Sequence, residues 1–77
     1  TACVFVKVNL KASAAVGRSL SRIKGIRELY KTAGENDDFL AIVDGADTAA
    51  IDATIGEIVA VSGVERTSSK IMLAKIR

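Results

Sequence analysis

Few residues of this 77-residue sequence could do chemistry, and histidine is not among them. The absence of His excludes Ser-His dyads, imidazole metal ligands and imidazole switches near neutral pH. The single cysteine, Cys3, can form neither an intrachain disulfide nor a Cys-rich metal site. With no His to activate it, we interpret Cys3 as a packed apolar side chain and not as a nucleophile.

Two polar groups remain as candidate sites. The first is the acidic group Glu35, Asp37 and Asp38 in the stretch 34–38. These residues could hold a cation, act as a general acid and base, contact a small ligand, or form a plain turn. Magnesium or calcium needs more oxygen ligands than so short a run can aim at one point, so a metal is disfavoured. The hydroxyls of Thr67, Ser68 and Ser69 could bind a small polar ligand or be ordinary strand residues.

Several common binding motifs are absent from the sequence. Neither a Gly-rich phosphate loop nor a Cys-x-x-Cys metal loop occurs. Stacking of RNA bases on Phe5 and Phe39 is an alternative, but their Val and Ile neighbours favour core packing. The net charge of +2 does not indicate a nucleic-acid surface. No cofactor, metal or direct DNA contact is expected.

The elements that position these residues follow from hydrophobic spacing. β-branched and aromatic residues predict strands over 2–8, 26–32, 39–43 and 64–77. A helix is predicted from the spacing i, i+4, i+8 and i+11 of Ala12, Val16, Leu20 and Ile23. A second helix, capped by Asp47 or Thr48, carries Ile51, Ile55, Ile58 and Val59. Gly25 and Gly63 end the two helices, and a hairpin loop occupies 34–38.

The resulting order is βαββαβ, and an internal repeat supports it. The motif at Gly25–Glu28 recurs 38 positions later at Gly63–Arg66, so that two βαβ halves result. This order predicts an α+β ferredoxin-like sandwich: a four-stranded antiparallel sheet, the first and third strands central, and both helices on one face. The whole chain, 1–77, is expected to form one domain.

Both faces of the predicted sheet are apolar. In the first strand Val4 and Val6 point to one face and Phe5 to the other, and residues 39–43 alternate in the same way. Two helices can cover only one face. We therefore expect the other face to pack against an identical sheet in a two-fold dimer.

The compartment is inferred from composition. A single Cys suits a reducing environment, and neither a signal peptide nor an apolar run long enough for a membrane span is present. We expect a cytoplasmic protein with no membrane partner.

The run from Lys24 to Gly34, followed by Asp37 and an apolar strand, resembles the amino-acid-sensing domain of Lrp/AsnC-type regulators, also called the RAM domain. The later stretches 55–58 and 63–67, with Ile71 and Leu73, continue this resemblance over nearly the whole chain. Several spaced motifs of this resemblance agree with the βαββαβ order that the hydrophobic spacing predicts.

The resemblance implies a transcription-regulating, non-enzymatic domain. Such domains dimerise through their sheets, assemble into rings of eight or ten chains, and bind a free amino acid between dimers. In full-length members a DNA-binding helix-turn-helix precedes the domain, whereas here the first strand starts at about residue 2. The chain therefore resembles the stand-alone members, which act through ligand binding or association with full-length Lrp/AsnC regulators.

The resemblance also assigns ligand-binding residues to the loop after the second strand and the start of the last strand. It implies that Gly34 lets the backbone approach the ligand and that Asp37 accepts hydrogen bonds from its α-ammonium group. Thr67 and Ser69 would hold the carboxylate or a polar side chain, and Tyr30 would line the wall. Members often carry an aromatic residue before the loop aspartate, where this sequence has Asn36.

Two other functions fit the same topology. A small dimeric α/β-barrel enzyme, such as a cofactor-free monooxygenase or isomerase, shares the sheet-to-sheet dimer, but the lack of His and Trp argues against it. A scaffold that only oligomerises with other regulators would differ from the sensing domain in binding no ligand.

Overall fold

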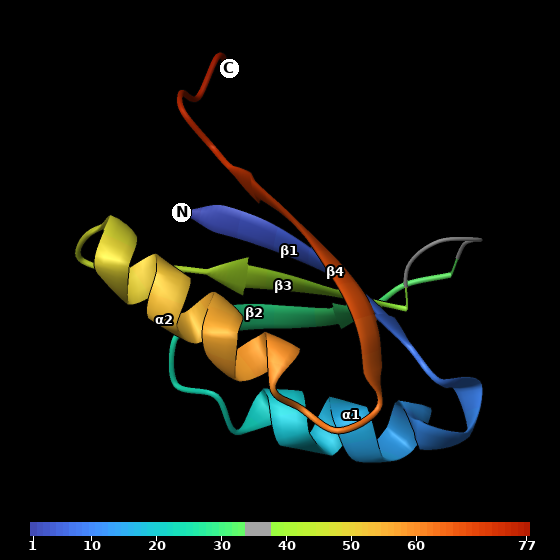
Figure 1. The fold of residues 1–77 in the computed structure, drawn as a ribbon. Helices are drawn as coiled ribbons and strands as arrows, with labels where there is room; N and C mark the ends of the chain where they lie inside the picture. The colour runs from blue at the N-terminus through green and yellow to red at the C-terminus, as the bar shows by residue number, and fades with distance from the viewer. Residues whose placement is uncertain (34–37) are drawn as a thin grey trace.

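The computed structural model describes residues 1–33 and 38–77, and it confirms the predicted βαββαβ order (Figure 1). A short 3₁₀ helix, η1, lies between β1 and α1. The elements are β1 Ala2–Val8, η1 Leu10–Ala12, α1 Ser13–Ser21, β2 Ile26–Lys31, β3 Phe39–Val43, α2 Thr48–Val59 and β4 Val64–Ile71.

The four strands form one antiparallel sheet in the order β2-β3-β1-β4. The central pair aligns Val4 with Ala41, the β1–β4 pair aligns Val6 with Thr67, and the β2–β3 pair aligns Tyr30 with Leu40. The first and third strands are therefore central, as predicted, and β2 and β4 are the two edges.

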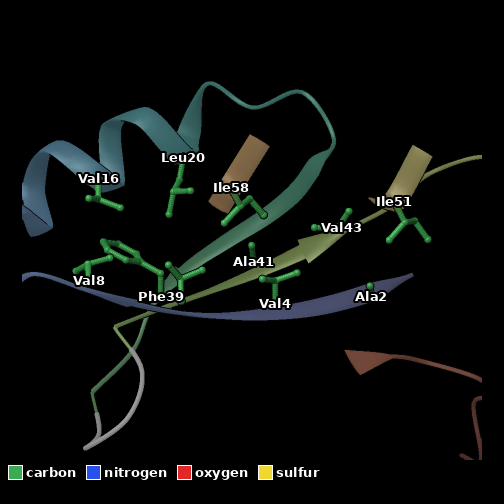
Figure 2. Packing of buried hydrophobic residues seen from close by; sticks show 11 residues of the cluster. Ala2, Val4, Val8, Val16, Leu20, Phe39, Ala41, Val43, Ile51 and Ile58 are labelled. Carbon is green, nitrogen blue, oxygen red and sulfur yellow. The ribbon is translucent and has the colours of Figure 1, made fainter. Parts of the chain in front are cut away.

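Both helices cover the same face of the sheet and enclose the core (Figure 2). Val16 and Leu20 of α1 lie one helical turn apart and are fully buried, together with Ile58 of α2. From the strands they meet Ala2, Val4, Val6, Val8, Phe39, Ala41 and Val43. Burial of each such Val, Leu or Ile side chain stabilises the fold by about 1.5–3 kcal/mol. The predicted alternation of β1 and β3 is thus confirmed.

The ends of α2 show why the helix occupies these residues. The side chain of Asp47 accepts a hydrogen bond of 2.9 Å from the backbone N–H of Ala50, which satisfies one of the free donors of the first turn. After the helix, Gly63 has a φ of 99°, a conformation that favours glycine. A Cβ atom at Gly63 would also lie 2.8 Å from side-chain atoms of Ala12 and Val16.

The last strand is shorter than predicted. The sequence indicated a strand over 64–77, but β4 ends at Ile71, opposite Ala2, the first residue of β1. One further hydrogen bond, from the N–H of Met72 to the carbonyl of Thr1, closes the ladder. Residues 72–77 are apolar in part, but no strand among the described residues pairs with them.

The two aromatic residues considered for base stacking lie on opposite faces of the sheet. Phe39 is buried beneath the helices, whereas Phe5 points to the uncovered face. They cannot form one stacking platform, which agrees with the interpretation of Phe39 as a core residue. Among the helices of the described residues, none has the length and apolar character to span a membrane.

Candidate functional site

The base of the loop between β2 and β3 and the start of β4 lie at the same end of the sheet, on either side of β1. The N–H of Thr32 donates to the carbonyl of Asp38 over 3.0 Å and closes the base of the loop. The N–H of Asp38 donates to the carbonyl of Val6 over 2.8 Å. Because Thr67 pairs with Val6 from the other side, the loop base and the start of β4 flank the same residue of β1.

Asp38, the residue directly before β3, is bound to β1 through its side chain. Its Oδ2 atom accepts a 2.9 Å hydrogen bond from the N–H of Val8 and lies 3.5 Å from Nζ of Lys7. The Val8 hydrogen bond and, to a lesser degree, the Lys7 ammonium group hold the pKa of Asp38 below its ordinary value of 3.8. Asp38 is therefore ionised near neutral pH and holds the segment directly before β3 against the end of β1.

Thr67 and Ser69 share one face of the sheet. Thr67 is paired with Val6 and Ser69 with Val4, and directly opposed residues project to the same side. The two hydroxyl groups therefore lie on the side covered by the helices. Thr67 is partly buried and Ser69 is exposed, because β4 is an edge strand.

Tyr30 lies far from that hydroxyl pair. It sits on β2, opposite Leu40, and its hydroxyl donates to the carboxylate of Glu28. Loss of the Tyr30 proton would break this hydrogen bond and place a second negative charge beside Glu28, so the pKa of Tyr30 is raised above 10.0. Three strand spacings, about 14 Å, separate β2 from β4. One chain thus does not bring Tyr30 and Thr67 together.

The candidates in the loop after β2 have different outcomes. Gly34 and Asp37, proposed as ligand contacts, lie outside the described residues, as does Glu35. Asp38 is described, and its Oδ2 atom contacts the N–H of Val8 and Nζ of Lys7. Within residues 1–33 and 38–77, no three Cys, Asp or Glu side chains gather in a way that could hold a metal ion.

The sequence interpretation missed the role of Lys7. Its contact with Asp38 joins residues that are far apart in the chain, and only the register of the sheet brings them together. One signal was available, since Lys7 is the single charged residue in the otherwise apolar β1.

The face of the sheet away from the helices is apolar at its centre and charged at its edges. One row across the four strands contains Glu28, Ile42, Cys3 and Lys70, and the next contains Tyr30, Leu40, Phe5 and Ser68. We call this surface the open face. The four side chains at its centre are partly buried, and no described helix covers them; they are Cys3, Phe5, Leu40 and Ile42.

A hollow of about 400 Å³ lies at the other end of the sheet, near the start of β1. Within it, Arg27 is paired with Asp44 at 2.7 Å and with Glu28 at 3.4 Å. The hydroxyl of Thr1 and then the guanidinium of Arg27 hold the pKa of Asp44 below its ordinary value of 3.8. The charge of Arg27 is therefore compensated, and the hollow offers little to an anionic ligand.

Comparisons with known proteins add independent information. The family model described as the Lrp/AsnC ligand binding domain matches residues 1–77. The HTH-type transcriptional regulator LysM of Saccharolobus solfataricus is 36% identical over 58 residues, which are 75% of this chain and 40% of LysM. The chain therefore spans well under half the length of this curated relative.

Solved structures share the fold. TTHA0845 of Thermus thermophilus is 26% identical with a TM-score of 0.85, covering 99% of this chain and 96% of that one. The feast or famine regulatory protein Rv3291c of M. tuberculosis, solved in complex with L-methionine, is 24% identical with a TM-score of 0.74. That alignment covers 99% of this chain and 51% of the other, and at this identity it concerns the fold alone.

Proposed function

Since this chain belongs to the Lrp/AsnC ligand-binding domain family, as the sequence resemblance predicted, we propose that it is a non-enzymatic regulatory domain that senses a free amino acid. One observation carries the proposal: the family match spans all 77 residues of a chain in which the base of the loop after β2 and the start of β4 flank β1 at the same end of the sheet. The L-methionine complex of the feast or famine protein supports an amino acid as the ligand class.

The ligand site is proposed at this end of the sheet. Asp37 would accept hydrogen bonds from the α-ammonium group, and Gly34 would allow a close approach of the backbone. Thr67 and Ser69 would hold the carboxylate or a polar side chain. An ammonium–carboxylate pair shielded from water is stronger than one at a surface, which favours a site closed by neighbouring chains.

Tyr30 would enter such a site from another copy of the chain. It lies on the opposite edge of the sheet from Thr67, and its side chain points to the opposite face. A site that contains both residues is therefore incomplete within one chain. This placement supports a ligand bound between copies.

The open face would form the dimer. When two sheets stack about a two-fold axis parallel to their strands, the β2 edge of each lies over the β4 edge of the other. Glu28 of one copy then faces Lys70 of its partner, because both belong to the same row. The central apolar residues meet one another, and the opposite charges at the edges favour this orientation.

Regulation would follow from assembly. A ligand that touches two dimers binds the assembled state better than separate dimers, so it shifts the equilibrium toward octameric or decameric rings. Transcriptional control would come from association with full-length Lrp/AsnC regulators, the class to which LysM belongs by its name.

A thermal-shift panel with each of the twenty amino acids tests the sensing role. A ligand at 100 times its Kd adds about 2.7 kcal/mol of stability, which raises the unfolding midpoint by several degrees. A selective rise with one or a few amino acids is expected. A flat panel on folded, assembled protein would replace the sensing role with that of a scaffold.

The Asp37→Asn variant then tests the site by calorimetry with the amino acid that gave the shift. Loss of a charged hydrogen-bond partner should weaken binding by about tenfold or more. Asp47→Asn is the matched control, because Asn caps a helix as well as Asp and the change also removes one negative charge. Equal affinities in the two variants would exclude Asp37 from the site.

A further inference from the structure

The two helices that cover the sheet carry opposite charges. The segment of η1, α1 and its C-terminal flank contains four exposed basic residues and no acidic one: Lys11, Arg18, Arg22 and Lys24. The segment of α2 and its N-cap contains three exposed acidic residues and no basic one: Asp47, Asp52 and Glu57. The overall charge of only +2 conceals this separation.

These charges are not neutralised within the described part of the chain. The ion pairs found there join Lys7 to Asp38, Arg27 to Glu28 and Asp44, and the N-terminal amine to Asp44. None of them involves a charged residue of either helix segment. The helix layer therefore presents a basic surface over α1 and an acidic surface over α2.

Gly56 gives a second, independent observation. Glycine inside a helix costs about 1 kcal/mol relative to alanine, so its presence in α2 calls for a reason. Gly17 of α1 has one, since an added Cβ would lie 3.3 Å from the ring of Phe39. At Gly56 an added Cβ would meet no other atom within 4 Å, and the residue is exposed. Nothing described within the chain requires this glycine.

Gly56 belongs to a stripe of small residues on the outer side of α2. Three further small, exposed residues lie on the same side of the helix, one or two turns from Gly56: Ala49, Ala53 and Ala60. Small side chains allow the axis of another helix to approach closely, and ridges of larger side chains pack into such grooves. Asp52 and Glu57 lie beside this stripe.

We propose that the helix layer is a second interface between copies of this chain, with α1 of each copy packed against α2 of the other. A two-fold axis that runs between the helices brings the basic surface of each copy onto the acidic surface of its partner, so the layer is self-complementary. A nucleic acid fits this layer less well, because the acidic surface lies beside the basic one and repels phosphate.

This interface uses the opposite side of the subunit from the open face. A chain with one self-complementary surface on each side can join its sheet-to-sheet dimers, through their helix layers, into assemblies larger than a dimer. The helix-layer contact does not require the ligand-binding role, and the sheet-to-sheet dimer can form without it.

Two charge-reversed variants test the contact. The first carries Arg18→Glu and Arg22→Glu, and the second carries Asp52→Lys and Glu57→Lys. Each alone should associate through its helices about 100-fold more weakly than the native chain, because like charges then meet twice in each contact. An equimolar mixture should regain assembly as a mixed complex, since each reversed helix then meets its opposite charge.

Sedimentation velocity at about 0.05 M and about 0.5 M salt measures these associations, and the native assembly should weaken at the higher salt. Gly56→Ala should raise the unfolding midpoint by a few degrees and Gly56→Leu should prevent helix-layer association. Three results would overturn the interface: no native assembly beyond dimers, no effect of the separate charge reversals, or no recovery in the mixture.

Binding of a duplex DNA fragment, measured by fluorescence anisotropy, distinguishes a nucleic-acid partner from a second copy of the chain. DNA binding that is lost on Arg18→Glu with Arg22→Glu, while native assembly persists in that variant, would overturn the proposal in favour of a nucleic-acid surface. The thermal-shift panel with amino acids tests the sensing role independently of this interface. A flat panel combined with recovery in the mixture would reject the sensing role and leave the helix-layer interface supported.

Discussion

The two faces of the sheet are built from the same strands but have different surroundings. On β1, Val4 and Val6 point to the helices and are fully buried, while Cys3 and Phe5 point to the open face and are only partly buried. On β3, Ala41 is buried and its neighbours Leu40 and Ile42 are not. The sheet therefore has more apolar surface than its two helices can cover.

The difference shows which stability belongs to the chain and which to its assembly. The covered face is completed by residues of the same chain, so its packing energy is available to a single copy. The open face has an apolar centre with charged margins, the composition of an interface with a polar rim. Substitutions on the two faces should consequently alter different measured quantities.

The largest effect on folding is expected at the covered face. Leu20→Ala leaves a cavity beneath α1 and should lower the free energy of unfolding by about 2–5 kcal/mol. Denaturant titration monitored by circular dichroism measures this change. Leu10→Ala is the matched control, because Leu10 is 87% exposed and its truncation should change stability by less than about 0.5 kcal/mol. Similar losses in both variants would contradict the described core.

A charge on the open face should act on association instead. Leu40→Lys places a cation in the centre of the proposed dimer, where burial of an unpaired charge costs several kcal/mol. The dimer dissociation constant, measured by sedimentation equilibrium, should rise by about 100-fold or more, while the far-ultraviolet spectrum of the separated chains is retained.

The conservative change Leu40→Met keeps the open face apolar and is the control for that experiment. It should leave the dissociation constant within about tenfold of the native value. If Leu40→Lys associates as tightly as Leu40→Met, the dimer does not use the open face and the contrast between the two faces loses its functional meaning.

The smallest effect is expected at the margin of the open face, where Lys7 meets Asp38. The pKa of Asp38 in the folded chain lies below its ordinary value of 3.8, so the ionised carboxylate stabilises the fold above that value. This stabilisation is lost as the pH falls through 3.8 and then through the lower folded-state pKa. At neutral pH the Asp38→Asn variant should therefore unfold at a lower temperature than the native chain.

Unfolding midpoints of both proteins between about pH 7 and about pH 3 measure this dependence, and the difference should narrow toward acid. Asp44, whose pKa is also lowered, is present in both proteins, so its contribution to the pH dependence of stability is the same in each. A difference that stays constant over the whole range would show that the charge of Asp38 does not stabilise the fold through its contacts with β1.

Much of the fold could be predicted from local patterns. The alternation of Val4, Phe5 and Val6 assigned the two faces of β1, and the one-turn spacing of Val16 and Leu20 located the buried side of α1. Asp47 was predicted as one of two possible caps of α2, and the structure selects it. Each of these signals depends on residues that are neighbours in the chain.

Other features required the arrangement of distant segments. The end of β4 at Ile71 depends on where β1 begins, because Ile71 pairs with Ala2, the first residue of β1. The contact of Lys7 with Asp38 depends on the register between β1 and β3. The separation of Tyr30 from Thr67 depends on the order of the strands. None of these could be obtained from spacing alone.

The sequence by itself determined the order of the elements, the two apolar faces of the sheet and the family, because hydrophobic period and recurrent motifs are local properties of the chain. The tertiary structure decided which residues share a surface. It placed the hydroxyls of β4 and the Tyr30 ring on opposite faces, and it set a basic helix beside an acidic one. Such relations arise only when segments distant in sequence pair and pack, since register and strand order fix their positions.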